Sequence, residues 1–204
     1  MFAPMLLSAL LPVLLIHGIK DDAAKMEPLA RHLRAQGREV RTMSLRPSWG
    51  QKGLDELAEQ LAAEADRVFP AGQKFDLVAF SMGGLVSRYY LQRLGGLDRV
   101  RRFVTISTPH RGTALAHLIP NPGCRQMRPG SDFLCDLERD ASELKRVGFT
   151  SFWTPLDLII LPARSSAVPE ARNVKLWVLA HPLMVWQSSA LRAVAGALDE
   201  PDPR

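Results

Sequence analysis

The stretch that decides the fold is Ala79-Phe80-Ser81-Met82-Gly83-Gly84, which joins an apolar run to an amphipathic one. The run Phe75–Phe80 is almost continuously apolar, as expected of a strand covered on both faces. The segment Met82–Leu94 has apolar residues at helical spacing and stops at two glycines. The sequence therefore predicts a sharp strand-to-helix turn with Ser81 at its tip.

A turn of this kind suits a nucleophilic serine. A serine hydroxyl is a weak nucleophile until it is held in the open beside a general base. A strained turn does this, and it needs small neighbours because the chain passes close to itself. Gly83 and Ala79 meet that need, although Ala79 stands where the usual pattern has glycine. The alternative is an ordinary N-cap serine, because helix starts prefer this residue type.

Short apolar runs alternate with longer amphipathic segments along the chain. Alternating strands and helices favour parallel pairing through right-handed crossovers. We therefore predict one domain over residues 1–204, with an open, mostly parallel sheet of about six strands, helices on both faces and no large cap domain. The predicted strands are Pro12–His17, Glu39–Ser44, Phe75–Phe80, Phe103–Ser107, Phe149–Trp153 and Val174–Ala180. The predicted helices are Ala24–Gln36, Leu54–Val68, Met82–Leu94, Ser131–Val147 and Ser188–Leu198.

The motif Leu15-Ile16-His17-Gly18-Ile19 ends the first predicted strand. In hydrolases with such a serine turn, the loop after this strand gives one backbone N–H to the oxyanion, and the residue after the nucleophile gives another. Ile19 and Met82 are the donors by position. Backbone N–H groups are fixed in place before the reaction, and they can stabilise an oxyanion whatever side chain the residue carries. A plain turn at a strand end is the alternative for this motif.

The general base is expected after the serine, because in this fold the chain order is serine, acid, histidine. His181 comes directly after the last predicted strand, where a loop can carry it over the carboxyl edge of the sheet. The remaining histidines fit less well, because two precede the serine, one follows a strand too early and one lies in an irregular stretch: His17, His32, His110 and His117. His181 is therefore the predicted base, and an exposed or structural histidine is the alternative.

The predicted acid is Asp157, which follows the strand Phe149–Trp153. Its neighbours are apolar, and a carboxylate there is costly unless it has a partner. An N–H of the His181 ring would supply one and would fix the tautomer of the ring. The other acids left open are Asp132, Asp136 and Asp140 in a charged helix, and Glu170 in the loop before the last strand.

These residues resemble the small bacterial lipases and esterases of the α/β-hydrolase superfamily, especially the triacylglycerol-lipase-like group. In some members alanine stands in the position of Ala79. The resemblance implies hydrolysis of carboxylic esters through an acyl-enzyme on Ser81, Asp157 and His181, without a cofactor. It runs from Val13 to Leu198 and is most specific at His17-Gly18, the Ala-x-Ser-Met-Gly-Gly turn, Thr108-Pro109-His110-Arg111-Gly112 and the loops of Asp157 and His181.

Two other functions stay open. An acyltransferase or a thioesterase would use the same triad and differ only in the acceptor or the leaving group. An inactive hydrolase fold would serve as a binding module, but such a protein is expected to lack a triad member. The stretch His110–Gly130 is a small flap or only a loop. Apolar residues near the predicted loops form either an acyl pocket or part of the core: Trp153, Pro155, Leu183, Met184 and Trp186.

Charge and composition limit the partners. The net charge of +5 favours contact with an anionic membrane or lipid aggregate. The basic residues are scattered and no nucleic-acid motif accompanies them, so no nucleic-acid partner is predicted. No His/Cys cluster has zinc spacing, so no metal is predicted. The expected partner is a small ester or a lipid substrate, and the oligomeric state stays open.

The N-terminal stretch Met1–Ile16 is apolar, but it lacks a basic start and runs directly into a predicted strand. We therefore predict neither a cleaved signal peptide nor a transmembrane helix there. A cytoplasmic or membrane-peripheral location is expected. The two cysteines, Cys124 and Cys135, do not form a CxxC pattern, and without an export signal free thiols are favoured over a disulfide.

Overall fold

The computed structural model describes residues 10–200. Within them, six parallel strands form one sheet in the order β2-β1-β3-β4-β5-β6. This confirms the predicted open parallel sheet. The strands are β1 (Val13–Ile16), β2 (Val40–Met43), β3 (Phe75–Phe80), β4 (Val100–Ile106), β5 (Gly148–Trp153) and β6 (Arg172–Lys175).

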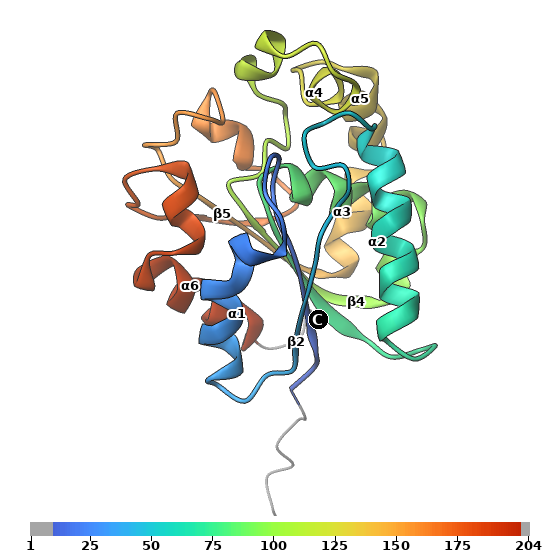
Figure 1. The fold of residues 1–204 in the computed structure, drawn as a ribbon, viewed down its shortest axis with the longest axis vertical. Helices are drawn as coiled ribbons and strands as arrows, with labels where there is room; N and C mark the ends of the chain where they lie inside the picture. The colour runs from blue at the N-terminus through green and yellow to red at the C-terminus, as the bar shows by residue number, and fades with distance from the viewer. Residues whose placement is uncertain (1–9, 201–204) are drawn as a thin grey trace, which may run out of the picture.

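Helices cover both faces of the sheet (Figure 1). The α-helices are α1 (Glu27–Arg34), α2 (Leu54–Val68), α3 (Met82–Arg93), α4 (Pro122–Gln126), α5 (Asp132–Glu138) and α6 (Ser188–Leu198). Short 3-10 helices join them: η1 (Ala23–Met26), η2 (Gly96–Asp98), η3 (Ala114–Leu118), η4 (Ala141–Arg146), η5 (Ala163–Ser166) and η6 (His181–Val185).

The strands supply apolar side chains to both faces. In β1, Val13 and Leu15 belong to one cluster of buried residues, whereas Leu14 and Ile16 belong to the other, and all four are fully buried. Successive residues of a strand point to opposite faces. A strand without polar residues is therefore what a sheet covered on both sides requires.

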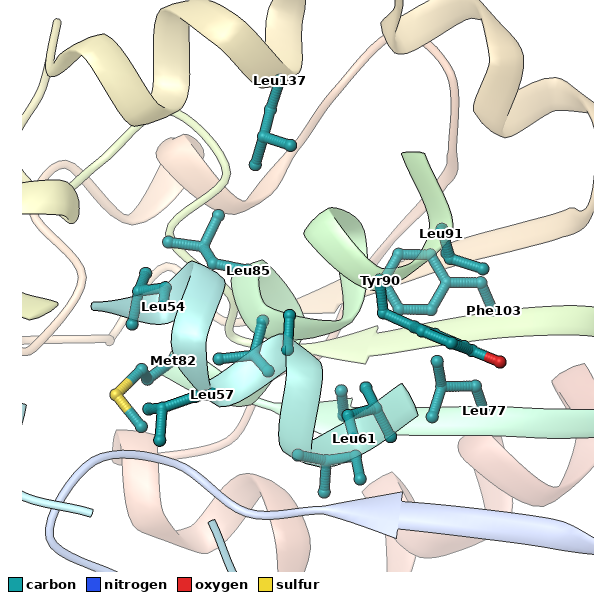
Figure 2. Packing of buried hydrophobic residues seen from close by; sticks show 14 of the residues in the cluster. Leu54, Leu57, Leu61, Leu77, Met82, Leu85, Tyr90, Leu91, Phe103 and Leu137 are labelled. Atoms are coloured by element: carbon teal, nitrogen blue, oxygen red, sulfur yellow. The ribbon is translucent and has the colours of Figure 1, made fainter. Parts of the chain in front are cut away.

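The amphipathic helices complete the two clusters. In the first, Leu57 and Leu61 of α2 pack with Leu85 of α3 over one face of the sheet (Figure 2). In the second, Leu33 of α1 and Val194 of α6 are buried on the opposite face. Figure 1 shows α1 and α6 together on one side of the sheet and α2 and α3 on the other.

The last strand differs from its prediction. Val174–Ala180 is predicted, but β6 covers Arg172–Lys175. As the edge strand, β6 pairs only with β5, which ends at Trp153. The N–H of Leu176 still donates to the carbonyl oxygen of Trp153, at 2.8 Å, and beyond it the chain has no strand to pair with.

The predicted helix Ser131–Val147 is also wrong as one element, because it consists of α5 and η4. Asp140, between them, has a φ of −126° and leaves helical geometry. Its carboxylate instead accepts hydrogen bonds from Gln92 at 2.8 Å and Arg93 at 2.5 Å, both on α3. These bonds to a second helix outweigh the helical pattern of the local sequence.

Residues 1–9 of the apolar N-terminal stretch lie outside the described residues, as do residues 201–204. Between residues 10 and 200, no helix has both the length and the apolar character needed to cross a membrane. Cys124 is buried, Cys135 is exposed, and both are free, as predicted.

Candidate active site

Ser81 lies at the turn between β3 and α3. Its φ of +54° and ψ of −125° are rare for a residue with a side chain. Its N–H donates to the carbonyl oxygen of Ile106 at 2.8 Å, which ties the turn to the end of β4. The turn therefore holds Ser81 at the carboxyl edge of the sheet, with the strand, turn and helix in the predicted order.

Close packing explains the small residues around the turn. A Cβ on Gly18 would lie 2.9 Å from the Cβ of Ser81, and a Cβ on Gly83 would collide with the carbonyl oxygen of His17. The methyl group of Ala79, by contrast, is accommodated in the fully buried strand β3. The two glycines are therefore needed for the approach of β1 to the turn.

His181 and Asp157 are in direct contact. His181 Nδ1 lies 2.7 Å from Asp157 Oδ2, and both side chains are buried. The other carboxylate oxygen, Oδ1, accepts the N–H groups of Ile159 and Ile160, each at 2.9 Å. An ionised carboxylate can only accept, so Nδ1 carries the proton and Nε2 is left to accept one.

The surroundings of Asp157 favour the ionised carboxylate. Burial acts to raise the pKa of Asp157, but hydrogen bonds from His181, Ile160 and Ile159 act in the opposite direction, and the pKa is lowered overall. The carboxylate is thus able to fix both the tautomer and the orientation of the His181 ring.

Ser81 and His181 line one cavity of about 550 Å³. The ring of Phe80, on the same wall, packs against the His181 ring with centroids 4.7 Å apart. No hydrogen bond joins Ser81 Oγ to His181 Nε2 in this structure, and catalytic bonds of this kind are often long before a substrate binds. Most of the remaining wall is apolar, including Leu115, Leu118, Ile119, Met127, Ile159 and Ile160.

This apolar wall was not predicted from the sequence. The wall comes largely from residues within His110–Gly130, so that stretch lines the cavity. None of the residues considered for an acyl pocket lines it, so the pocket alternative is wrong, and of the five the core alternative holds for Met184. Met184 is fully buried in the core, Trp186 lines a separate groove, and Trp153 and Pro155 line a third cavity beside β6. The missed signal was the apolar pair Leu118-Ile119 inside a loop rich in proline and glycine.

Ile19 and Met82, the predicted oxyanion donors, flank the serine. Ile19 lines the cavity. The side chain of Met82 packs into the core beside Leu57 (Figure 2), so only its backbone can serve the site. Met82 opens α3, and the first N–H groups of a helix have no partner within it. The turn and loop hydrogen bonds among residues 10–200 use neither the N–H of Ile19 nor that of Met82.

His17 has a structural place behind the site. The N–H of Leu45 donates to His17 Nε2 at 2.9 Å, so Nδ1 carries the ring proton and donates to the carbonyl oxygen of Gly18 at 2.7 Å. Burial lowers the pKa of His17, consistent with a neutral ring. His17 therefore fixes the loop that carries Ile19.

None of the alternative histidines and acids lines the cavity. Asp136 and Asp140 form ion pairs with Arg93 of α3. His110 Nε2 lies 3.0 Å from the hydroxyl of Thr105 in the interior. In residues 10–200, no group of three or more His, Cys, Asp or Glu side chains is placed to hold a metal ion.

Solved structures share this fold. The mature lipase BlEst2 of Bacillus licheniformis has a TM-score of 0.80 at 17% identity, over 94% of this chain and 93% of that one. Lipase B of Aspergillus fumigatus has a TM-score of 0.81 at 18% identity, over 94% of this chain and 53% of that one. A pyrethroid hydrolase of Sphingobium faniae has a TM-score of 0.64 at 14% identity, over 94% and 98%. The fold is the α/β-hydrolase fold without a large cap, as predicted.

A family match adds to this likeness of fold. Residues 12–160 match the family described as palmitoyl protein thioesterase. The matched range contains β1 to β5, and with them Ser81 and Asp157, and it ends before His181. Because the match covers most of the sequence, the chain belongs to the palmitoyl protein thioesterase family.

Proposed function

We propose that this chain is a serine hydrolase that cleaves acyl esters, with Ser81 as nucleophile, His181 as general base and Asp157 as the acid that orients it. One observation carries the proposal. Ser81, held at a positive φ, opens into the same cavity as His181, whose Nδ1 is bound by a buried carboxylate. A nucleophile and a base in one apolar cavity, with an acid bound to the far nitrogen of the base, are the parts that acyl transfer needs.

Acylation follows from these roles. Ser81 Oγ attacks the carbonyl carbon of the ester, and its proton passes to His181 Nε2. The carbonyl oxygen becomes an oxyanion, which the N–H groups of Ile19 and Met82 stabilise. When the tetrahedral intermediate collapses, the bond to the leaving group breaks and His181 gives its proton to the leaving group.

Deacylation repeats the same steps with water. His181 takes a proton from a water molecule, whose oxygen attacks the acyl carbon on Ser81. The second tetrahedral intermediate breaks the bond to Ser81 Oγ, and Oγ recovers the proton from His181. The carboxylic acid is released, and the protein returns to its starting state without a cofactor.

The apolar wall points to an apolar acyl group. A cavity of about 550 Å³ is within the usual range for small-molecule sites. A second groove, of about 960 Å³, lies on the other side of Lys20, Asp21 and Lys25, which line both spaces. We assign the apolar cavity to the acyl chain and the more polar groove to the leaving group.

A thioester is the second candidate for the bond that is cleaved. The family match favours it, because the family is described by a thioesterase activity. The same three residues serve both chemistries, since only the leaving atom changes from oxygen to sulfur. Matched oxyesters and thioesters with the same acyl group, compared by kcat/KM, distinguish the two. A thioester preference well beyond the difference in intrinsic reactivity would assign the chain to thioester cleavage.

A fluorophosphonate probe tests the proposed nucleophile directly. Wild-type protein should be labelled, and Ser81→Ala protein should not. Ser107→Ala is a matched control, because Ser107 is also buried, also directly follows a strand and also has a positive φ, of 48°. Labelling that survives in Ser81→Ala, or that is absent from well-folded wild-type protein, would overturn the assignment. The second outcome would favour a binding module.

A series of p-nitrophenyl esters from acetyl to palmitoyl then tests the acyl cavity. The value of kcat/KM should rise as the chain lengthens, because each methylene buried on the wall adds about 0.8 kcal/mol. Leu115→Asp, which places a carboxylate on that wall, should suppress long-chain turnover more than acetyl turnover. An equal loss for both substrates would contradict the assignment of the cavity.

A further inference from the structure

Exposed apolar side chains are concentrated at the carboxyl edge of the sheet. Ten large hydrophobic side chains are exposed among residues 10–200. One of them, Leu10, precedes β1 at the amino edge. The other nine lie in segments that follow the carboxyl ends of β2, β4, β5 and β6: Trp49, Leu118, Leu156, Leu158, Ile159, Trp177, Leu179, Leu183 and Trp186.

The exposure of these side chains is large. Leu118, Leu158 and Leu179 are each 76% exposed, and Trp177 is 69% exposed. Single exposed apolar residues are ordinary, but a set gathered on one end of a domain marks an interaction surface. In a parallel sheet the segments that follow strands begin at the same edge, so these nine side chains come from segments that begin at one edge of the sheet.

This apolar surface is continuous with the acyl cavity. Leu118 and Ile159 are exposed and also line the cavity that contains Ser81. Trp49 and Trp186 line the adjoining groove. An acyl chain that entered from a lipid phase would therefore stay on apolar side chains until it reached Ser81.

Five exposed cations lie at or after strand ends on this edge: Lys20 follows β1, Lys175 ends β6, and three more follow β2, β4 and β5, namely Arg46, Arg111 and Arg164. None of them forms an ion pair with a carboxylate of the described residues. The ammonium groups of Lys20 and Lys175 each lie 5.0 Å from the centre of a tryptophan ring, Trp49 and Trp177. Tryptophan paired with lysine is suited to a membrane interface, where the ring meets lipid and the cation meets headgroups.

Between each strand end and the helix that follows it, Asp22 is the one exposed acidic residue among residues 10–200. Asp157 is buried against His181, and Asp22 caps η1 by accepting the N–H of Ala24 at 2.9 Å. Asp21 and Glu170 are partly buried. The exposed charge on this edge is therefore mainly positive and is complementary to an anionic surface.

We propose that these nine apolar side chains and five cations, together called the rim, dock on an anionic phospholipid bilayer. The apolar side chains enter the bilayer and the cations meet its headgroups. The delivery of an acyl chain from the bilayer to Ser81 rests on the proposed function, whereas the docking itself does not. A second copy of the chain is a poorer occupant, because a symmetric dimer would bring the rim cations against one another and close the cavity.

Co-sedimentation with vesicles tests the docking. Ser81→Ala protein is used, so that lipid is not consumed and binding is measured apart from catalysis. It should sediment with phosphatidylglycerol–phosphatidylcholine vesicles and much less with phosphatidylcholine alone. Trp177→Ser/Leu179→Ser should weaken partition at least about tenfold on both, because two exposed apolar anchors are lost. Arg164→Glu/Lys175→Glu should weaken binding to the anionic vesicles alone.

Two control variants lie at the opposite edge. Leu10→Ser removes the exposed apolar residue before β1, and Lys145→Glu reverses an exposed cation on η4. Both changes are made in the Ser81→Ala protein, called the parent, and both variants should bind vesicles as the parent does. In an active background, Trp177→Ser/Leu179→Ser should hydrolyse a water-soluble acetyl ester normally, which shows that the protein is folded.

Three results would overturn the docking. The first is failure of the parent to bind anionic vesicles while the wild type hydrolyses soluble ester. The second is equal binding by the parent and the Trp177→Ser/Leu179→Ser variant. The third is a dimer in sedimentation velocity that this variant converts to a monomer, because the rim would then be a contact between copies of the chain.

Discussion

The two edges of the sheet use their charged side chains in opposite ways. At the amino edge, Asp76 is fully buried and accepts two hydrogen bonds from Arg101, at 3.0 and 2.7 Å. Arg38, also buried, lies 3.7 Å from the same carboxylate. At the carboxyl edge, Asp157 is the one buried carboxylate among residues 10–200 that binds an imidazole ring, that of His181. Within the same residues, the exposed cations of the rim form no ion pair with a carboxylate.

The difference follows from the direction of the chain. Every strand of the sheet ends at the carboxyl edge, so the turns that precede helices, with their free N–H groups, gather there. Among residues 10–200, the amino edge instead carries ion pairs, such as those of Arg99 with Asp66 and Arg146 with Asp98. Substitutions at the two edges should therefore separate activity from stability.

Asp157→Asn should have the largest effect, and only on activity. The amide cannot stabilise a positively charged His181, and it favours the wrong ring tautomer, so kcat should fall about 10⁴-fold. Thermal unfolding should stay close to that of the wild type. Asp132→Asn is the matched control, because Asp132 is an exposed acid that the sequence left open. Comparable losses in both variants would remove Asp157 from the site.

Asp76→Ala should have the opposite profile. It removes the carboxylate that faces the buried Nη1 of Arg38, and breaking one side of a buried ion group costs about 3 kcal/mol of unfolding free energy. Burial raises the pKa of Asp76 although Arg101, Arg38 and Arg102 lower it, so intact pairing stabilises the fold less than the number of bonds suggests. Urea unfolding measures the loss. The kcat of the folded fraction should be unchanged, and a matching loss of kcat would link the two edges.

Gly18→Ala should act on the geometry of the site. The added Cβ would lie 2.9 Å from the Cβ of Ser81, which is closer than such atoms approach, so one of the two must shift. A small displacement of a nucleophile can cost about 10²-fold in rate. Steady-state kinetics should show a fall in kcat with little change in KM. Gly196→Ala is the control, because a Cβ there meets open space on α6. Normal kcat in Gly18→Ala would show that the turn tolerates the contact.

The sequence predicted the parts of the site that depend on local pattern. Ser81 was identified because it directly follows an apolar strand and is followed, after Met82, by two glycines that open a helical pattern. Asp157 and His181 follow from chain order, and the structure places their side chains 2.7 Å apart. The assignment of catalytic roles to these residues remains a prediction for the experiments above.

The parts that depend on tertiary contacts could not be predicted. The end of β6 is set by the end of its only neighbour, β5, which no pattern within residues 174–180 reveals. The break between α5 and η4 depends on the bonds of Asp140 to α3. The acyl wall brings Leu118 and Ile159 together from different loops, and a sequence does not show which apolar loop residues meet.

A change of pH should have the smallest effect, on the free energy of unfolding, and it acts through His110 in the interior between the two edges. Burial, with smaller contributions from Arg88 and Arg111, lowers the pKa of His110 well below its ordinary value of 6.5. Below about pH 6.5 the unfolded chain therefore binds a proton that the folded chain does not. The free energy of unfolding then decreases as the pH is lowered, by up to about 1.4 kcal/mol per pH unit. His17 acts in the same direction.

Urea unfolding of His110→Gln between pH 7 and pH 5 should show a free energy of unfolding that depends less steeply on pH than in the wild type, because one of the two groups no longer titrates. Identical slopes would mean that His110 is protonated in the folded state, where its Nδ1 has no hydrogen-bond partner among the described residues.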